Sequence, residues 1–188
     1  MSAVVEKTIY EDIAQFYPLK TTNLSHSQRM INFLSSIAPG DLKMNKIATR
    51  LHIDNKTAEN YFKILTEIGM VKTLHPVDHG HQLLSKPAKA YLGNTTLLAA
   101  SNAVLSADMN VGTMRELAFL QALSGAGLQA FYPKVGDFQI GDRLFEVGGK
   151  NKTHSQLKSV QGDKYIVKDN VLMTYGRELP LYLFGFLY

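Results

Sequence analysis

Two carboxylates stand on either side of a tight turn in the second half of the chain. Asp137 opens the segment DFQIG, and Glu146 follows nine residues later in FEVGGK. Gly141 and Asp142 between them predict the turn of an antiparallel hairpin, which would bring the two carboxylates near each other. Carboxylate oxygens are ligands that Mg²⁺ prefers, and a bound Mg²⁺ polarises a phosphodiester and activates water. The alternative is that both are solvated carboxylates of a surface hairpin.

A lysine at a fixed spacing from these acids would indicate a metal-dependent nuclease site. Metal-dependent nucleases of the PD-(D/E)xK type carry a lysine two residues after the second acid, where it steadies the charge that develops on the phosphate. Position 148 of this chain is a glycine, and the nearest candidate is Lys150. A regular strand would place Lys150 on the side of Glu146 but roughly 6–7 Å further along. Because misplacement by about 1 Å can cost on the order of a hundredfold in rate, we expect little or no nuclease turnover.

The stretch Gly148-Gly149-Lys150 also resembles part of a phosphate-binding loop. Such a loop needs the pattern G-x-x-x-x-G-K-[ST], in which successive backbone N–H groups surround the phosphates. With Lys150 as the lysine, the first glycine would fall on Leu144 and the hydroxyl residue on Asn151. Two fixed positions fail, so this stretch is not a phosphate-binding loop.

The first half of the chain has the order of elements of a winged helix-turn-helix unit, to which we assign residues 1–86. Gly69 ends the last helix, and a strand follows it. A polar turn, HIDNKT, separates the last two helices. The apolar periodicity predicts helices over 4–16, 25–37, 47–51 and 58–68, and a strand over 70–77.

The second helix of that unit would present a polar face to a nucleic acid. Lysines on it would contact phosphates, and an asparagine would pair with an adenine edge. The alternatives are an ordinary solvated helix face, or a module that docks another protein. The candidate residues are Asn55, Lys56, Thr57, Asn60 and Lys63.

The second half, residues 87–188, reads as a small α/β unit. Short strand patterns separated by turn residues follow two helices, and Pro180 suits the first turn of a final apolar helix. The predicted strands are 88–92, 129–132, 137–140, 144–147 and 165–167, and the predicted helices are 97–105, 111–124 and 155–160. We expect two hydrophobic cores that meet near residues 85–94. The first would contain Phe62, Leu65 and Ile68, and the second Leu117, Val147 and Leu183.

Composition sets outer limits on the function. The 188 residues carry 20 Lys and Arg against 16 Asp and Glu, a net charge of +4, so nucleic acid is an acceptable partner but not a required one. The absence of cysteine excludes disulfides and thiolate metal sites and fits a cytoplasmic protein. The longest apolar run, LPLYLFGFLY at 179–188, is too short to cross a bilayer, so we expect no membrane association.

The segment KIATRLHIDNKTAENYFKILTEIGMVKTL is followed along the chain by VGTMRELAFLQAL and YPKVGDFQIGDRLFEVGGKNKT. Together with three further segments, in this order, they resemble a large prokaryotic family of predicted AAA-type ATPases. That resemblance implies an N-terminal ATPase module, then a winged helix, then a C-terminal domain similar to PD-(D/E)xK nucleases. The chain would correspond to the C-terminal part, so that ATP is bound only through a preceding module of the same full-length protein. The resemblance covers essentially the whole chain and rests on TIYEDIAQFY, KIATRLHIDNKTAENYFKILTEIGMVKTL, SKPAKAYLGNTTLLAA, VGTMRELAFLQAL, YPKVGDFQIGDRLFEVGGKNKT and LPLYLFGFLY.

The resemblance also implies a set of site residues. The nuclease-like site would combine Glu116 from the long helix with Asp137 and Glu146, of which the last two would hold Mg²⁺. Lys150 remains the nearest candidate for the lysine. The alternative for Glu116 is an ordinary exposed glutamate on a helix.

Three functions remain open from the sequence. The first is a regulatory, nucleic-acid-interacting region of an ATPase, with DNA as the expected nucleic acid and a nuclease-like site that is inactive. The second is an active Mg²⁺-dependent DNA nuclease. The third is a protein-interaction module without a role on DNA. The fold expected in all three is α+β, a winged helix-turn-helix followed by a small domain like the restriction endonucleases, and the oligomeric state is not predicted.

Overall fold

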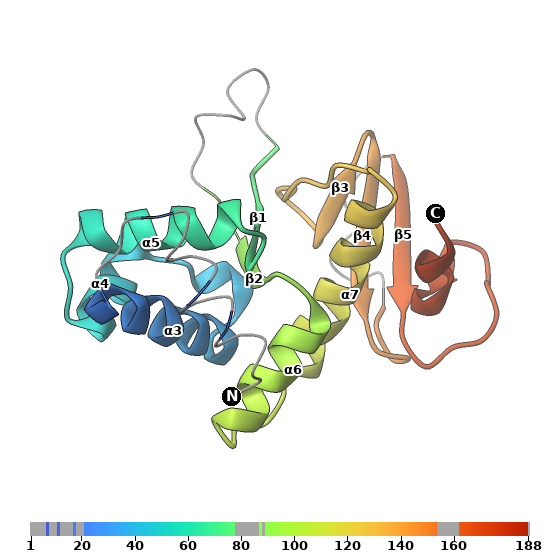
Figure 1. Cartoon of the computed structure of the whole chain (residues 1–188). Helices are drawn as coiled ribbons and strands as arrows, with labels where there is room; N and C mark the ends of the chain where they lie inside the picture. The colour runs from blue at the N-terminus through green and yellow to red at the C-terminus, as the bar shows by residue number, and fades with distance from the viewer. Residues whose placement is uncertain are drawn as a thin grey trace. The chain divides into compact units, whose positions relative to one another are not determined.

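The computed structural model (Figure 1) describes residues 7, 11, 17, 21–77, 87, 89–153 and 162–187. It is a mixed α+β protein whose described strands form two separate sheets, as expected from the sequence. The described residues fall into two units. The first lies within Met1–Thr73 and Ala90–Met109, and the second within Leu74–Lys89 and Asn110–Tyr188.

Unit 1 is built from helices around a two-stranded sheet. The strands β1 and β2 pair with each other, and Met30, Ile31, Ile47, Tyr61 and Leu65 are almost completely buried between the helices. Burial of this apolar surface is the main stabilising term for such short helices, since isolated helices of this length are marginal in water. The elements are α3 (Thr21–Ser36), the 3₁₀ helix η2 (Pro39–Asp41), α4 (Met44–Leu51), α5 (Asn55–Glu67), β1 (Val71–Leu74), β2 (Lys89–Leu92) and α6 (Thr95–Val104).

The turn between α4 and α5 is fixed by local hydrogen bonds. His52 ends α4 in the left-handed conformation, with φ at 57°. Asp54 caps α5 by accepting hydrogen bonds from the backbone N–H of Thr57 at 2.9 Å and from its hydroxyl at 2.6 Å. These bonds, the hydroxyl bond foremost, hold the pKa of the Asp54 carboxyl below its usual value. The two helices and the polar turn predicted here are confirmed.

Unit 2 places one long helix against a four-stranded sheet. Strand order is β3-β4-β5-β6, with β3 antiparallel to β4 and the other neighbours parallel. Phe119 of the helix lies 5.1 Å from the ring of Phe138, 5.5 Å from that of Phe145 and 4.7 Å from that of Phe184, so aromatic packing joins helix and sheet. The elements are α7 (Val111–Gly125), β3 (Phe138–Ile140), β4 (Arg143–Gly148), β5 (Asp163–Lys168), β6 (Glu178–Pro180) and the 3₁₀ helix η3 (Leu181–Phe186).

The division into units differs from the sequence-based boundary between 86 and 87. Helix α6 belongs to unit 1, because it packs against α3, while Leu74–Lys89 belongs to unit 2. The chain therefore passes from unit 1 to unit 2, back to unit 1 and again to unit 2. Local hydrophobic patterns do not reveal such a path, since it depends on which distant segments pack together.

Two core predictions need correction. Leu183 is 40% exposed rather than buried. It lies on η3, where Phe184 turns inward to Phe119 and leaves its neighbour outward. Ile68 is half-buried, whereas Leu65, Leu117 and Val147 are in the core as predicted.

Some predicted elements have a smaller extent or lie outside the described residues. The strand expected over 129–132 is reduced to isolated bridges at Phe131 and Tyr132. The helix expected over 155–160 lies outside the described residues, as does nearly all of the one over 4–16. Among the described helices, none is long and apolar enough to cross a membrane.

A substitution at Gly93 would test the close packing in unit 1. Its N–H donates to the carbonyl oxygen of Met70 at 2.8 Å, and a Cβ added to it would collide with the carbonyl oxygen of Gly69. We expect Gly93→Ala to destabilise the protein by about 1–3 kcal/mol in chemical denaturation, as overpacked sites do. Gly40→Ala is the control, because an added Cβ there meets no atom within 4 Å, and its effect should stay within about 0.5 kcal/mol. Equal effects of the two substitutions would contradict this packing.

Candidate functional site

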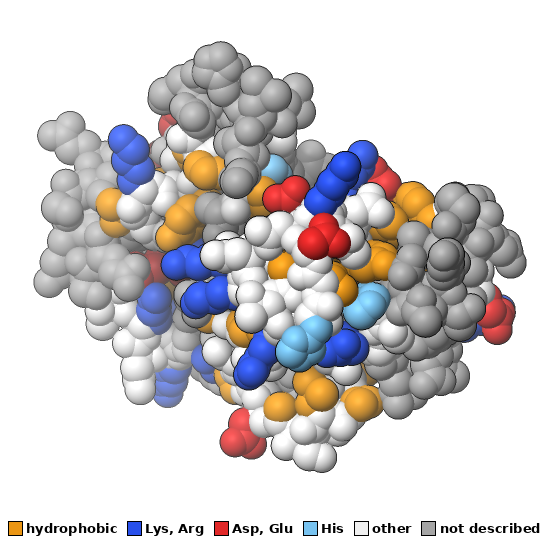
Figure 2. Space-filling model, turned by 90° about the vertical axis from the view of Figure 1, so that its left-hand side faces the viewer, with side chains coloured by type: hydrophobic (Ala, Val, Ile, Leu, Met, Phe, Trp, Pro, Cys, Tyr) orange, Lys and Arg blue, Asp and Glu red, His pale blue; other side chains and the backbone are white. Residues whose placement is uncertain are grey.

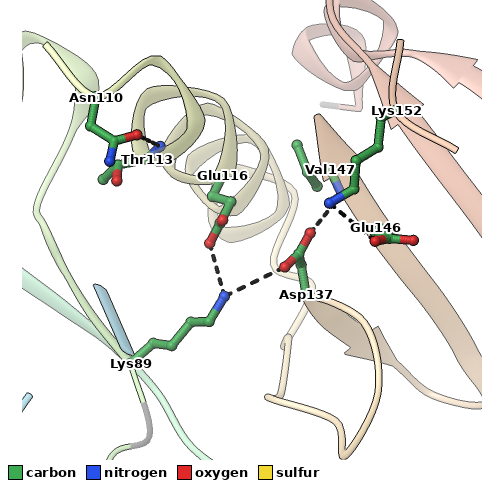
Figure 3. Close-up of polar contacts among 8 residues, drawn as sticks. All are labelled: Lys89, Asn110, Thr113, Glu116, Asp137, Glu146, Val147 and Lys152. Carbon is green, nitrogen blue, oxygen red and sulfur yellow. Dashed lines mark hydrogen bonds and ion pairs between the residues drawn. The ribbon is translucent and has the colours of Figure 1, made fainter. Parts of the chain in front are cut away.

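The three acids singled out in the sequence all belong to unit 2 and come from three places in the chain (Figure 3). Glu116 lies on α7, Asp137 directly precedes β3, and Glu146 lies within β4. Helix α7 starts where Asn110 accepts a hydrogen bond from the backbone N–H of Thr113 at 3.1 Å, which places Glu116 on its second turn.

Lys89 connects the first two acids. Its Nζ lies 2.9 Å from Oε2 of Glu116 and 3.6 Å from Oδ1 of Asp137. The lysine side chain is only 11% exposed, and its ammonium lies 5.2 Å from the centre of the Tyr132 ring. In a partly buried environment of this kind, one ammonium between two carboxylates offsets much of their mutual repulsion. Sequence reasoning missed Lys89, although a lysine in the otherwise apolar strand AKAYL was a signal.

Asp137 is also tied to the strand that carries Glu146. Its Oδ2 accepts a hydrogen bond from the backbone N–H of Val147 at 2.9 Å. Its own N–H donates to the carbonyl oxygen of Phe145 at 3.0 Å. The Asp137 side chain thus takes the place of a backbone acceptor at the end of the β3–β4 ladder. Its donor, Val147, directly follows Glu146. The predicted hairpin is confirmed, and Asp137 contacts the backbone of β4 across it.

Glu146 is completely buried, with 0% of its side chain exposed. Nζ of Lys152 lies 3.0 Å from its Oε1, which is the distance of an ion pair. From the described residues, however, neither carboxylate oxygen accepts a hydrogen bond of acceptable geometry. Within that part of the chain, the charge of Glu146 is compensated by Lys152 while its hydrogen-bonding capacity is not used, and a buried charge of this kind depends strongly on its cation.

Lys152, and not Lys150, is the lysine that reaches Glu146. A Cβ added to Gly148 would lie 2.8–2.9 Å from Cβ, Cγ and Cδ of Lys152, so the lysine side chain runs across position 148. That is the position from which the PD-(D/E)xK lysine would project. Lys152 returns there because its N–H donates to the carbonyl oxygen of Gly149 at 2.9 Å, which closes a turn. Lys150 is exposed on the same turn. Strand spacing alone could not predict this reversal.

The acids as they lie do not fit a shared Mg²⁺ site. Phe145 faces α7, so its neighbour Glu146 points to the opposite side of the sheet from the helix that carries Glu116. Each carboxylate is in contact with a lysine, and both oxygens of Asp137 are occupied. In the part of the chain that the structure describes, no three His, Cys, Asp or Glu residues group closely enough to hold an ion.

The candidate nucleic-acid residues form one exposed side of α5 with mixed charge. Asn55, Lys56 and Asn60 are exposed, while Thr57 is engaged in capping the helix with Asp54. The side chain of Lys63 is 73% exposed, and its Nζ lies 3.7 Å from Oε1 of Glu67. Glu67 also accepts a hydrogen bond from the hydroxyl of Tyr17 at 2.8 Å, a bond that raises the pKa of Tyr17.

Comparison with known proteins gives three findings. Residues 1–108 match the family model described as domain of unknown function (DUF8612). No curated protein sequence matches the chain. A solved structure of a mutant of S. aureus MepR aligns with 14% identity and a TM-score of 0.31, over 56% of this chain and 71% of that one, which is too weak a similarity to carry an argument.

The contact between Lys152 and Glu146 predicts a difference between two nearby lysines. Lys152→Met leaves a buried carboxylate without its cation, and we expect a loss of about 3 kcal/mol in the free energy of unfolding. Lys150→Met, the matched control on the same turn, should change it by no more than about 0.5 kcal/mol. Adding Glu146→Gln to Lys152→Met should recover part of the loss, because the unpaired charge is removed. Equal stability of the two single variants would contradict the pairing.

Proposed function

We propose that this chain, which belongs to the DUF8612 family of domains of unknown function, is a nucleic-acid-interacting region rather than a working nuclease. In this proposal unit 1 is a winged helix that binds DNA through the exposed side of α5. Unit 2 is a nuclease-like domain whose acids are neutralised by lysines. The two parts rest on separate observations.

The order of elements in unit 1 supports the winged-helix assignment. Two helices joined by a short capped turn, α4 and α5, lead through Gly69 into β1, which pairs with β2. In helix-turn-helix proteins the second helix enters the major groove. Here that helix is α5, and Lys56, Asn60 and Lys63 are exposed on it.

The observation that carries the proposal is the exposure of these cations. Glu67 accepts a hydrogen bond from the Tyr17 hydroxyl and lies 3.7 Å from the ammonium of Lys63. The side chain of Lys63 is nevertheless largely exposed to solvent. Figure 2 shows the side of the molecule on which α4 and the start of α5 lie in Figure 1. Lys and Arg side chains are spread over its described part, with carboxylates interspersed. Such a surface supports contacts to phosphate and is too mixed in charge for a strong nonspecific polyanion site.

The assignment of unit 2 as catalytically silent is supported by two of its lysines, Lys89 and Lys152. Lys89 lies between Glu116 and Asp137, and Lys152 pairs with Glu146, so each carboxylate that a metal-dependent nuclease would use to bind metal is in contact with an ammonium group. With α7 ahead of the β3–β4 hairpin, the order of elements is compatible with a nuclease-like fold. Following the family resemblance, we propose that ATP is handled by an ATPase module of the same full-length protein.

DNA binding through α5 has a measurable salt signature. Each lysine that contacts a phosphate releases counterions, so the slope of log affinity against log salt should fall by roughly 1 for each lysine removed. We expect Lys56→Ala with Lys63→Ala to weaken binding about equally for unrelated DNA sequences and to reduce that slope by roughly 2 in fluorescence anisotropy titrations. Lys150→Ala in unit 2 is the control. An unchanged slope in the α5 double variant would place any DNA contact elsewhere.

The second expectation concerns catalysis. Wild-type protein and Glu146→Ala should both leave plasmid and single-stranded DNA uncut in the presence of Mg²⁺ or Mn²⁺, because lysines occupy the carboxylates. The readout is the conversion of supercoiled plasmid on a gel. Metal-dependent cutting by the wild type that Glu146→Ala abolishes would refute the silent site and establish a nuclease.

A further inference from the structure

Helix α4 carries positive charges where they cost stability. The N-terminal end of a helix has a partial positive charge, which favours acidic residues and a capping oxygen. On α4 the N-cap position is Lys43, which makes no side-chain capping hydrogen bond, and the first turn contains Lys46 and no acid. A sequence selected only for helix stability would not place two lysines there.

Two arginines, Arg50 of α4 and Arg29 of α3, lie near the C-terminal end of α4. Arg50 stands one turn after Lys46, and like charges at this spacing repel each other. Arg29 of α3 donates from its guanidinium to the carbonyl oxygens of Arg50 at 3.4 Å and Leu51 at 3.3 Å, which holds a third cation beside them. Among the side chains that the structure describes in unit 1, the ion pair is Lys63–Glu67, and none of them places a carboxylate within 4 Å of Arg29, Lys46 or Arg50.

A cavity of about 320 Å³ lies beside these charges, between α3 and α4. Five of the described residues line it, and none of these five is acidic: Phe33, Asn45, Lys46, Thr49 and Arg50. Phe33 is half-buried, so part of its ring remains accessible from the cavity. The hydroxyl of Thr49 donates to the carbonyl oxygen of Asn45 at 2.9 Å, within the helix. Lys46 and Arg50 are the charged groups among the described lining residues. We call this cavity the α3–α4 groove.

We propose that the α3–α4 groove binds one nucleotide of a single nucleic-acid strand, and this rests on the proposed nucleic-acid role of unit 1. The phosphates would lie against Lys46 and Arg50, which as charged groups at the rim favour a polyanion. The base would stack on the ring of Phe33, since aromatic rings are the usual platform for unpaired bases. Bases within a duplex are stacked on one another and do not offer a free face, so the aromatic wall favours a single strand.

The groove and the exposed side of α5 are different surfaces of unit 1. The α5 side offers lysines and an asparagine, and Glu67 there contacts both Lys63 and the hydroxyl of Tyr17. Among its described lining residues, the groove offers an aromatic ring and two cations and no acid. A chain that uses both would hold duplex DNA on α5 and an adjoining unpaired strand in the groove.

Three variants of the full chain test this proposal in anisotropy titrations with an oligo-dT strand and with a duplex of the same length. Lys46→Gln with Arg50→Gln should weaken dT binding on the order of tenfold. Phe33→Leu keeps an apolar side chain of similar size, and it should weaken dT binding on the order of tenfold with little effect on duplex binding. The α5 double variant Lys56→Gln with Lys63→Gln has the same charge change as the first and should affect duplex binding more than dT binding.

The outcomes separate the groove from the wider proposal. If the α5 variant loses duplex binding while the groove variants bind dT like the wild type, the groove assignment is wrong and the nucleic-acid role stands. If the wild type binds neither oligonucleotide, both are wrong. Thymidine monophosphate that binds as tightly as the dT strand would overturn the assignment to a strand. Melting temperatures of the surface variant Lys46→Gln with Arg50→Gln control for folding, because neither side chain is buried.

Discussion

A buried carboxylate on a β-strand lowers the stability of the folded protein unless its charge is paired, and the arrangement around Glu146 follows from that requirement. Removing an ion from water is offset only by a close opposite charge. Lys152 supplies that charge from the turn after β4, and it can lie flat across the strand because position 148 has no side chain. The pair of glycines that first resembled a phosphate-binding loop thus makes room for a lysine and begins the turn that brings it back.

The same residue types serve two opposite purposes in proteins. Three carboxylates and a lysine can hold a metal and act on a phosphodiester, or they can neutralise one another and hold a helix to a sheet. Here Lys89 joins α7 to the start of β3, and Lys152 fastens the end of β4. The three carboxylates and two ammonium groups balance their charge to within one unit, and the Lys89 contacts among them contribute to the joint between α7 and the sheet.

The parts predicted well from the sequence are those governed by neighbours along the chain. The α4–α5 pair and the β3–β4 hairpin follow from periodicity and from turn residues such as Asp54 and Gly141. The parts missed depend on distant segments. Lys89 is separated from Glu116 by 27 positions, and Lys152 reaches Glu146 only because the chain reverses after Gly149. Leu183 was misassigned because a 3₁₀ helix exposes a different side from that of the expected α-helix.

The passage of the chain between its units has a consequence for how this protein can be divided. Residues 1–108, which match the family model, end within one residue of Met109, where unit 1 ends, yet they include Leu74–Lys89, which packs with unit 2. No single break in the backbone separates the two units. A fragment that ends at Thr73 lacks β2 and α6, and one that ends after Met109 retains a segment stripped of its neighbours. A deletion meant to isolate either unit therefore has to remove an internal segment as well as a terminal one.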